Sequence, residues 1–199
     1  MTGRRVTGVV LAAGGSRRLG TPKQLLPYRH TTVLGATLDV ARSAGFDQLI
    51  VTLGGAAQAV RDAVPLDGAD VVTVEDFGAG CSASLRVALT RVHPQAAGIV
   101  LMLGDQPCVE PASLRRMVQH GRVAPAGAVM VCRYADGIGH PFWFSRGVFG
   151  ELLQLHGDKG VWKLIGSGRH PVRELAVPGP VPLDVDTWDD YRRLLEAVP

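Results

Sequence analysis

Short apolar runs alternate along this chain with segments in which apolar residues recur at helical spacing. Residues 98–103 form the clearest continuous run, which is typical of a strand buried on both faces of a sheet. Over residues 82–92, by contrast, the apolar side chains fall on one face of a helix. The same criteria predict strands at residues 6–13, 48–53, 71–74, 128–132 and 141–144, and helices at residues 32–44, 56–64, 111–120, 148–155, 159–165 and 187–197.

Continuous apolar strands separated by helices indicate an α/β fold with a mostly parallel sheet that helices cover on both faces. The chain has 199 residues, and a chain of that length buries about 70% of its unfolded surface around one core. We therefore expect a single domain over residues 1–199. Ligands of such sheets bind beyond the carboxyl ends of the strands, so the loops after the strands are the places to search for chemistry.

Composition narrows the function classes. With 46% hydrophobic and 20% charged residues, the chain belongs to neither the fibrous nor the disordered class. Its net charge of +3 comes without a long basic run, so we expect no nucleic acid partner. No signal peptide pattern or membrane-length apolar run is present, which favours a cytoplasmic protein without a membrane partner. Cys81, Cys108 and Cys132 show neither disulfide nor zinc spacing, and we expect them to be small core residues.

A basic, glycine-rich loop follows the first predicted strand. Gly14, Gly15 and Gly20 permit tight turns and let backbone N–H groups face an anion, while Arg17, Arg18 and Lys23 supply positive charge. The loop lacks the order of residues in a Walker A motif and the GxGxxG spacing of a dinucleotide fold. It therefore predicts a cradle for phosphates, with a flexible surface loop as the alternative.

Carboxylates follow two predicted strands. Asp105 comes directly after the strand at residues 98–103, and a short strand is expected to end at Asp184 and Asp186, whose side chains would point the same way. Carboxylates at this edge of a sheet can hold Mg²⁺. The alternatives are a turn at Asp105 and the opening of the last helix at Asp186 and Thr187.

No triad of Ser, His and Asp and no Cys–His pair can be argued from the spacing of residues along the chain. His140, beside Pro141, lies in a loop that could face a ligand, but a lone histidine there is more often a structural hydrogen-bonding residue. A basic loop with two separated carboxylates is instead what metal-assisted chemistry on a triphosphate requires.

Residues 11–20 read LAAGGSRRLG and are followed by PKQLL at residues 22–26. In this and the later motifs the chain resembles MobA-like nucleotidyltransferases over nearly its whole length. Its likeness is closest to the molybdenum cofactor cytidylyltransferases, which transfer CMP from CTP to the terminal phosphate of molybdopterin and release pyrophosphate. The later motifs are GCSASL at 80–85, GDQP at 104–107, GHP at 139–141, GDKG at 157–160 and DVDT at 184–187.

The resemblance implies a three-layer, Rossmann-like domain, with a nucleotide-binding half of about residues 1–110 and an acceptor-binding half of about residues 111–199. Ala13 stands where guanylyltransferase relatives tend to carry glycine, and its methyl group would narrow the base pocket toward a pyrimidine. The implied roles are catalysis for Lys23, Arg18 and Asp105; nucleotide binding for Leu11, Ala12, Ala13, Gly14, Gly15, Ser16, Arg18, Lys23 and Ser84; Mg²⁺ binding for Asp105 and Asp186; and acceptor binding for His140 and Asp158.

The chain departs from the family pattern at two aromatic residues, Trp162 and Trp188. Trp162 follows the GDKG motif, where relatives often have Ala-Arg, and we expect it to pack in the core. Alternative functions are nucleotidyl transfer to a sugar, polyol or lactate phosphate, a non-catalytic molybdopterin chaperone, and an NAD(P)H-dependent oxidoreductase. A molybdenum hydroxylase that receives the cofactor would be a further partner of the cytidylyltransferase.

Overall fold

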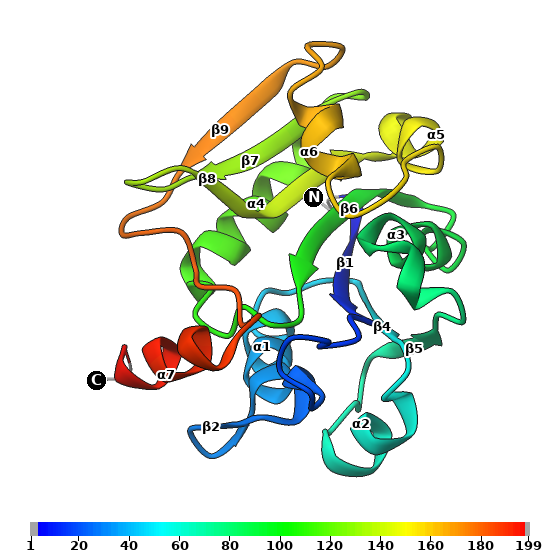
Figure 1. The fold of residues 1–199 in the computed structure, drawn as a ribbon. Helices are drawn as coiled ribbons and strands as arrows, with labels where there is room; N and C mark the ends of the chain where they lie inside the picture. Colours follow the sequence, from blue (N-terminus) through cyan, green and yellow to red (C-terminus); the bar gives the residue numbers. More distant parts are fainter. Residues whose placement is uncertain (1–3, 198–199) are drawn as a thin grey trace.

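The computed structural model describes residues 4–197, which are built around a seven-stranded sheet (Figure 1). Strand β8 is antiparallel to both of its neighbours, β6 and β7, and every other pair in the sheet is parallel. The predicted α/β class with a mostly parallel sheet is therefore confirmed. The strand order is β5 (Asp70–Thr73), β4 (Gln48–Leu53), β1 (Arg5–Ala12), β6 (Ala96–Leu103), β8 (Ile138–Ser145), β7 (Val129–Arg133) and β9 (Val172–Ala176).

Helices cover both faces of the sheet, because consecutive strand residues point to opposite sides and nearly all of them are apolar. One face packs against α1 (Val33–Arg42), α2 (Ala57–Ala63) and α4 (Pro111–Val123). The other packs against α3 (Cys81–Leu89), α5 (Phe149–Leu152) and α6 (Gly160–Ile165). The sheet thus lies between two helical layers, as a three-layer architecture requires (Figure 1).

A third, smaller apolar cluster joins the two ends of the chain. Helix α7 (Trp188–Glu196) places Leu194 against Leu19 and Leu26, beside the small hairpin of β2 (Pro27–Tyr28) and β3 (Thr31–Thr32). Val185 is fully buried in the same cluster. The packing fixes the segment before α7 against the loop that follows β1.

Some predicted elements were wrong. Strand β9 was missed because Leu175 is its one buried side chain, so that it carries no apolar run. The short strand expected to end at Asp186 does not form, since residues 181–186 have no regular secondary structure. Strand β8 begins at Ile138, within the segment expected to be a loop.

The cysteines differ from one another. Cys132 is buried as expected, but Cys81 and Cys108 are exposed, so the expectation that all three are core residues was wrong for these two. Cys81 lies at the start of α3 and Cys108 in the loop after β6, where the chain leaves the covered part of the sheet. Within residues 4–197, no helix has both the length and the apolar character needed to cross a membrane.

Candidate active site

The glycine-rich loop after β1 is held in one shape by its own polar groups. The backbone oxygen of Ser16 accepts hydrogen bonds from the N–H groups of Leu19 (3.0 Å) and Gly20 (3.1 Å), while the Ser16 hydroxyl accepts one from the Lys23 N–H (2.9 Å). Gln24, which is buried, donates from Nε2 to the carbonyl oxygens of Ala12 (2.7 Å) and Gly14 (3.0 Å). The start of the loop is therefore fixed before any ligand binds.

Charged side chains from three distant segments meet at Lys23. Its Nζ donates to a carboxylate oxygen of Asp105, just beyond β6, and to Oδ1 of Asp186 (2.8 Å), just before α7. Arg18 Nη2 lies 2.6 Å from the other oxygen of Asp186. The side chains of Lys23 and Asp105 are only 15% and 11% exposed, whereas that of Asp186 is 42% exposed.

The environment shifts the protonation equilibria of this charge cluster. Burial alone would lower the pKa of Lys23, but the neighbouring Asp105 and Asp186 carboxylates outweigh burial and raise it. Burial tends to raise the pKa of Asp186, but Lys23 and Arg18 lower it overall. Lys23 and Asp186 are therefore both held in their charged forms.

Asp184 adds a third carboxyl group close by. Gln106, itself buried, donates from Nε2 to Asp184 Oδ1 (2.7 Å) and to the Pro182 carbonyl (3.1 Å). Burial, followed by repulsion from Asp105 and Asp186, raises the pKa of Asp184 to about 6. Three carboxyl groups, those of Asp105, Asp184 and Asp186, are therefore gathered beside Lys23 and Arg18.

These groups open into a cleft of about 600 Å³ beyond the carboxyl ends of β1 and β6. The expected nucleotide-binding residues all line it, and so do both expected metal ligands and Asp158 of the expected acceptor residues. The fold brings these residues together at one cleft, and their individual roles stay predictions. The lining includes Leu11, Ala12, Ala13, Gly14, Gly15, Ser16, Arg18, Lys23, Ser84, Asp105, Asp158 and Asp186.

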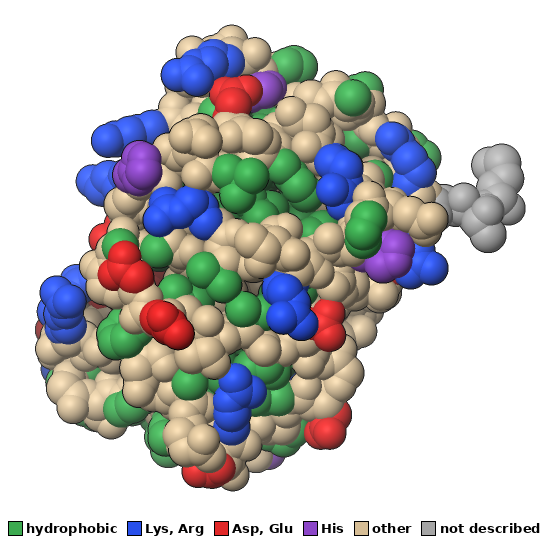
Figure 2. Space-filling model, turned by 90° about the vertical axis from the view of Figure 1, so that its right-hand side faces the viewer, with side chains coloured by type: hydrophobic (Ala, Val, Ile, Leu, Met, Phe, Trp, Pro, Cys, Tyr) green, Lys and Arg blue, Asp and Glu red, His purple; other side chains and the backbone are tan. Residues whose placement is uncertain are grey.

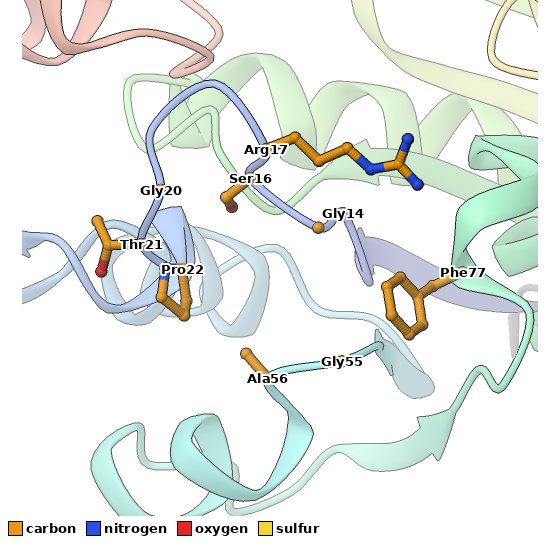
Figure 3. Close-up of a pocket in the computed structure, with 10 residues that line it drawn as sticks. Gly14, Ser16, Arg17, Gly20, Thr21, Pro22, Gly55, Ala56 and Phe77 are labelled. Carbon is orange, nitrogen blue, oxygen red and sulfur yellow. The ribbon is translucent and has the colours of Figure 1, made fainter.

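A second cavity of about 340 Å³ adjoins the cleft. Residues 14–17 and Phe77 line both spaces, and the remaining lining of the second comes from Gly20, Thr21, Pro22, Gly55 and Ala56. Figure 3 shows the Phe77 ring directed toward Gly14 and Gly55, with the Arg17 side chain on the Gly14 side of the ring.

The two expected acceptor residues lie in different surroundings. Asp158 Oδ1 accepts a hydrogen bond from the Cys81 N–H (3.0 Å) at the start of α3, inside the cleft. His140 does not line the cleft; its ring centroid lies 4.1 Å from that of Phe142, and burial lowers its pKa to about 3. The His140 carbonyl accepts a bond from the Tyr134 hydroxyl (2.7 Å). The imidazole is therefore neutral, and its role in acceptor binding stays a prediction.

The two tryptophans at which the chain departs from the family pattern are both partly exposed. Trp162 is 41% exposed and contacts Phe142 edge to face at 5.0 Å, so the expectation that it packs in the core was wrong. It lies in a six-residue helix that directly follows the exposed residues Asp158 and Lys159. Trp188, at the first position of α7, is also exposed and packs against Tyr191.

Sequence reasoning did not single out Gln24 or Phe77, which also line the cleft. Gln24 lies within the PKQLL motif, which carried a usable signal, whereas no pattern marks Phe77. Asp184 was named beside Asp186, and Lys159 stands in the GDKG motif, but neither was given a site role. The positions of Phe77 and Lys159 depend on how the loops after β5 and α5 fold.

The residues present fit one divalent cation that a substrate helps to bind. Among residues 4–197, no group of three or more His, Cys, Asp or Glu side chains is arranged to hold a metal ion unaided. Asp105 and Asp186 nevertheless converge on one ammonium group, which marks a site for positive charge. Mg²⁺ commonly takes one or two carboxylates together with water and substrate phosphates, which matches this donor set.

Figure 2 shows one face of the molecule, on which both basic and acidic side chains are present.

Part of this chain is similar in sequence to known proteins. The chain is 34% identical to nicotine blue oxidoreductase of Paenarthrobacter nicotinovorans over 125 residues, which are 61% of this chain and 61% of that protein. It is 32% identical over 153 residues to the bifunctional protein GlmU of Kineococcus radiotolerans, covering 73% of this chain but only 31% of GlmU. The chain therefore matches less than two thirds of the length of either relative.

Solved structures match over the whole chain. The crystal structure of Rv0371c from Mycobacterium tuberculosis is 77% identical, with a TM-score of 0.93, and the match covers 99% of this chain and 100% of that one. The manganese complex of Rv0371c matches with 74% identity and a TM-score of 0.88, over 98% of this chain and 100% of that one. The model of the MobA-like NTP transferase domain matches residues 8–173. The chain therefore belongs to the MobA-like NTP transferase family.

Proposed function

We propose that this protein is a Mg²⁺-dependent nucleotidyltransferase that transfers CMP from CTP to the terminal phosphate of molybdopterin and releases pyrophosphate. The observation that carries the proposal is the meeting of Lys23, Asp105 and Asp186 within a cleft bordered by a prearranged glycine-rich loop. Such a site offers cationic groups to a triphosphate and carboxylates to the cation that accompanies it.

The triphosphate is bound by the loop and its basic side chains. Gly14 and Gly15 have no side chain between the backbone and the cleft, so phosphate oxygens can approach closely. Arg18 and Lys23 supply positive charge at the side of the cleft where Asp105 and Asp186 lie. Ser84, buried on α3, contacts the base or the ribose.

In the reaction, an oxygen of the acceptor phosphate attacks the α-phosphorus of CTP. The bond from that phosphorus to the oxygen that bridges to the β-phosphate breaks, and pyrophosphate leaves with the bonding electron pair. Lys23 leaves the carboxylates to donate to the non-bridging oxygens as their charge grows. When bound by Asp105 and Asp186, Mg²⁺ supplies further positive charge to the phosphates. The attacking oxygen is already anionic, so no general base is needed.

The choice of substrates rests on the resemblance and on the two sides of the cleft. The methyl group of Ala13 narrows the base site and favours cytosine over guanine. Asp158 and His140 belong to the proposed acceptor half, about residues 111–199, and residues 1–110 form the nucleotide half. Manganese in the Rv0371c complex supports the use of a divalent cation by this chain as well.

The test is pyrophosphate release from CTP, GTP, UTP or ATP with Mg²⁺ and molybdopterin, or with a panel of sugar, polyol and lactate phosphates. We expect release with CTP and molybdopterin and loss of at least about 100-fold in the Asp105→Asn variant, because removal of one preorganised charged contact costs that much. Unchanged activity in Asp105→Asn would remove Asp105 from the mechanism. Release with another acceptor only would assign that acceptor instead.

A second candidate function is that of an oxidoreductase, favoured by the 34% identity to nicotine blue oxidoreductase. The glycine-rich loop lacks the dinucleotide fingerprint, which weighs against it. Binding of NADPH without binding of any triphosphate would favour the oxidoreductase and contradict nucleotidyl transfer.

A further inference from the structure

Phe77 stands between the cleft and the second cavity. It is the first residue of a single 3₁₀ turn, Phe77–Ala79, that connects β5 to α3. The ring lines both the space of about 600 Å³ and the adjoining one of about 340 Å³. Residues 14–17 are the other part of the chain that both spaces share. The ring and this loop segment therefore lie where the two spaces adjoin.

A glycine in the loop after β4 makes room for the ring. A Cβ atom on Gly55 would lie 2.7 Å from Phe77 Cζ, closer than real Cβ atoms approach, and one on Gly54 would lie 3.0 Å from Phe77 Cβ. A Cβ on Gly15 would lie 3.7 Å from the edge of the ring, in ordinary contact. The ring is thus seated against the loop after β4 and reaches the loop after β1.

The charges in the cleft indicate which part of a nucleotide lies beside Phe77. Lys23, Asp105 and Asp186 occupy one region and suit phosphates and their cation. Beside Phe77 the cleft lining includes Gly78 and Arg17, and a Cβ atom on Gly78 would lie 3.6 Å from Arg17 Nη2. A flat ligand group such as a nucleobase fits against the uncharged Phe77 ring.

We propose that the bulk of Phe77 restricts the nucleotide base to a pyrimidine, an inference that rests on the proposed function. The ring occupies the passage into the second cavity, where the additional ring of a purine would have to lie. A smaller residue at this position would join the two spaces and admit the purine. Phe77 is thus a specificity-determining residue that acts by excluding volume.

The experiment measures dissociation constants of CTP and GTP, with Mg²⁺, by calorimetry on the full chain. The wild type should bind CTP more tightly than GTP. In Phe77→Ala, the affinity for GTP relative to CTP should rise by about tenfold, the smaller end of the range for pocket-size discrimination, because both bases lose contact with the ring and only the purine gains room. The control variant Phe77→Met retains much of the side-chain volume and should keep the preference for CTP.

Binding of inorganic tripolyphosphate serves as the check on loop structure. All three proteins should bind it equally, because the phosphate side of the cleft does not include the Phe77 ring. The inference would be overturned if the preference for CTP over GTP were unchanged in Phe77→Ala. It would also be overturned if Phe77→Met lost this preference as fully as Phe77→Ala. Loss of tripolyphosphate binding in Phe77→Ala would also overturn it, by showing that the residue supports the loop. A wild type that binds tripolyphosphate but prefers GTP overturns the inference alone, whereas one that binds no triphosphate contradicts the proposed function itself.

Discussion

Lys23 occupies the position between Asp105 and Asp186 where positive charge is required. Its side chain is 15% exposed, so its interactions with the carboxylates are poorly screened by solvent. The ammonium group bridges the two carboxylates in the free protein, and in the proposed reaction the same group donates hydrogen bonds to phosphate oxygens.

Replacement of Lys23 by Met should destabilise the protein by about 3 kcal/mol, because it leaves two neighbouring carboxylates without their shared partner. Adding Mg²⁺ should recover most of this loss, since the cation takes the vacated position. Urea unfolding of wild type and variant, with and without Mg²⁺, measures both effects.

Arg17→Met is the matched control for that experiment. Arg17 is exposed and, among residues 4–197, forms no ion pair, so the loss of its charge should leave stability nearly unchanged. Equal stabilisation of wild type and Lys23→Met by Mg²⁺ would contradict a shared position for lysine and metal.

The buried His140 should make the stability of the folded chain depend on pH. Burial lowers its pKa to about 3 in the folded chain, from an ordinary value of 6.5. Between these values the unfolded chain binds a proton that the folded chain does not, so stability is fully present above pH 6.5 and falls as the pH drops toward 3. His140→Phe should reduce this slope by up to about 1.4 kcal/mol per pH unit in urea unfolding between about pH 6 and pH 4. Identical slopes would show that His140 is protonated in the folded chain.

At the scale of elements, α7 controls the placement of Asp186. Thr187 accepts a hydrogen bond from the Asp190 N–H (3.2 Å), and Asp190 Oδ2 accepts bonds from the N–H groups of Thr187 (2.9 Å) and Asp186 (3.3 Å). Thr187 and Asp190 thus form a capping box at the start of α7. The first turn of α7 therefore fixes the backbone that carries a proposed metal ligand.

Thr187→Ala should lower the free energy of unfolding by about 1 kcal/mol through loss of the helix cap. It should also weaken Mg²⁺-dependent binding of triphosphate, because the backbone of Asp186 loses part of its support. Thr187→Ser keeps the hydroxyl and should behave like the wild type in both calorimetry and urea unfolding. Full affinity in Thr187→Ala would show that α7 does not position Asp186.

The elements also show where sequence reasoning succeeds. Strands β1, β4 and β6 are buried on both faces, so their apolar runs identify them and the loops that follow. Strand β9 has one buried residue and gives no such pattern. Asp184 and Asp186 reach the same cleft although the strand expected to carry them does not form, because Val185 between them is buried in the third apolar cluster. Phe77 could not be predicted, since the position of its ring depends on Gly55 in another loop.

At the scale of the whole molecule, the fold brings together segments that are far apart in sequence. Arg18 and Asp186 are separated by 168 residues, yet they form an ion pair at one edge of the sheet. The parallel strands β1 and β6 end side by side there, and the third apolar cluster brings α7 to the same edge. The loop, the carboxylates and the cleft are therefore consequences of topology as much as of local sequence.

The most direct test of nucleotidyl transfer as the function is thermal unfolding with CTP, GTP, UTP, ATP or NADPH, each with and without Mg²⁺. A ligand at about 100 times its dissociation constant stabilises the folded chain by about 2.7 kcal/mol, which raises the Tm by about 5–10 °C at this size. We predict such a rise with CTP only when Mg²⁺ is present. A rise in Tm with NADPH, and none with any triphosphate, would contradict nucleotidyl transfer as the function.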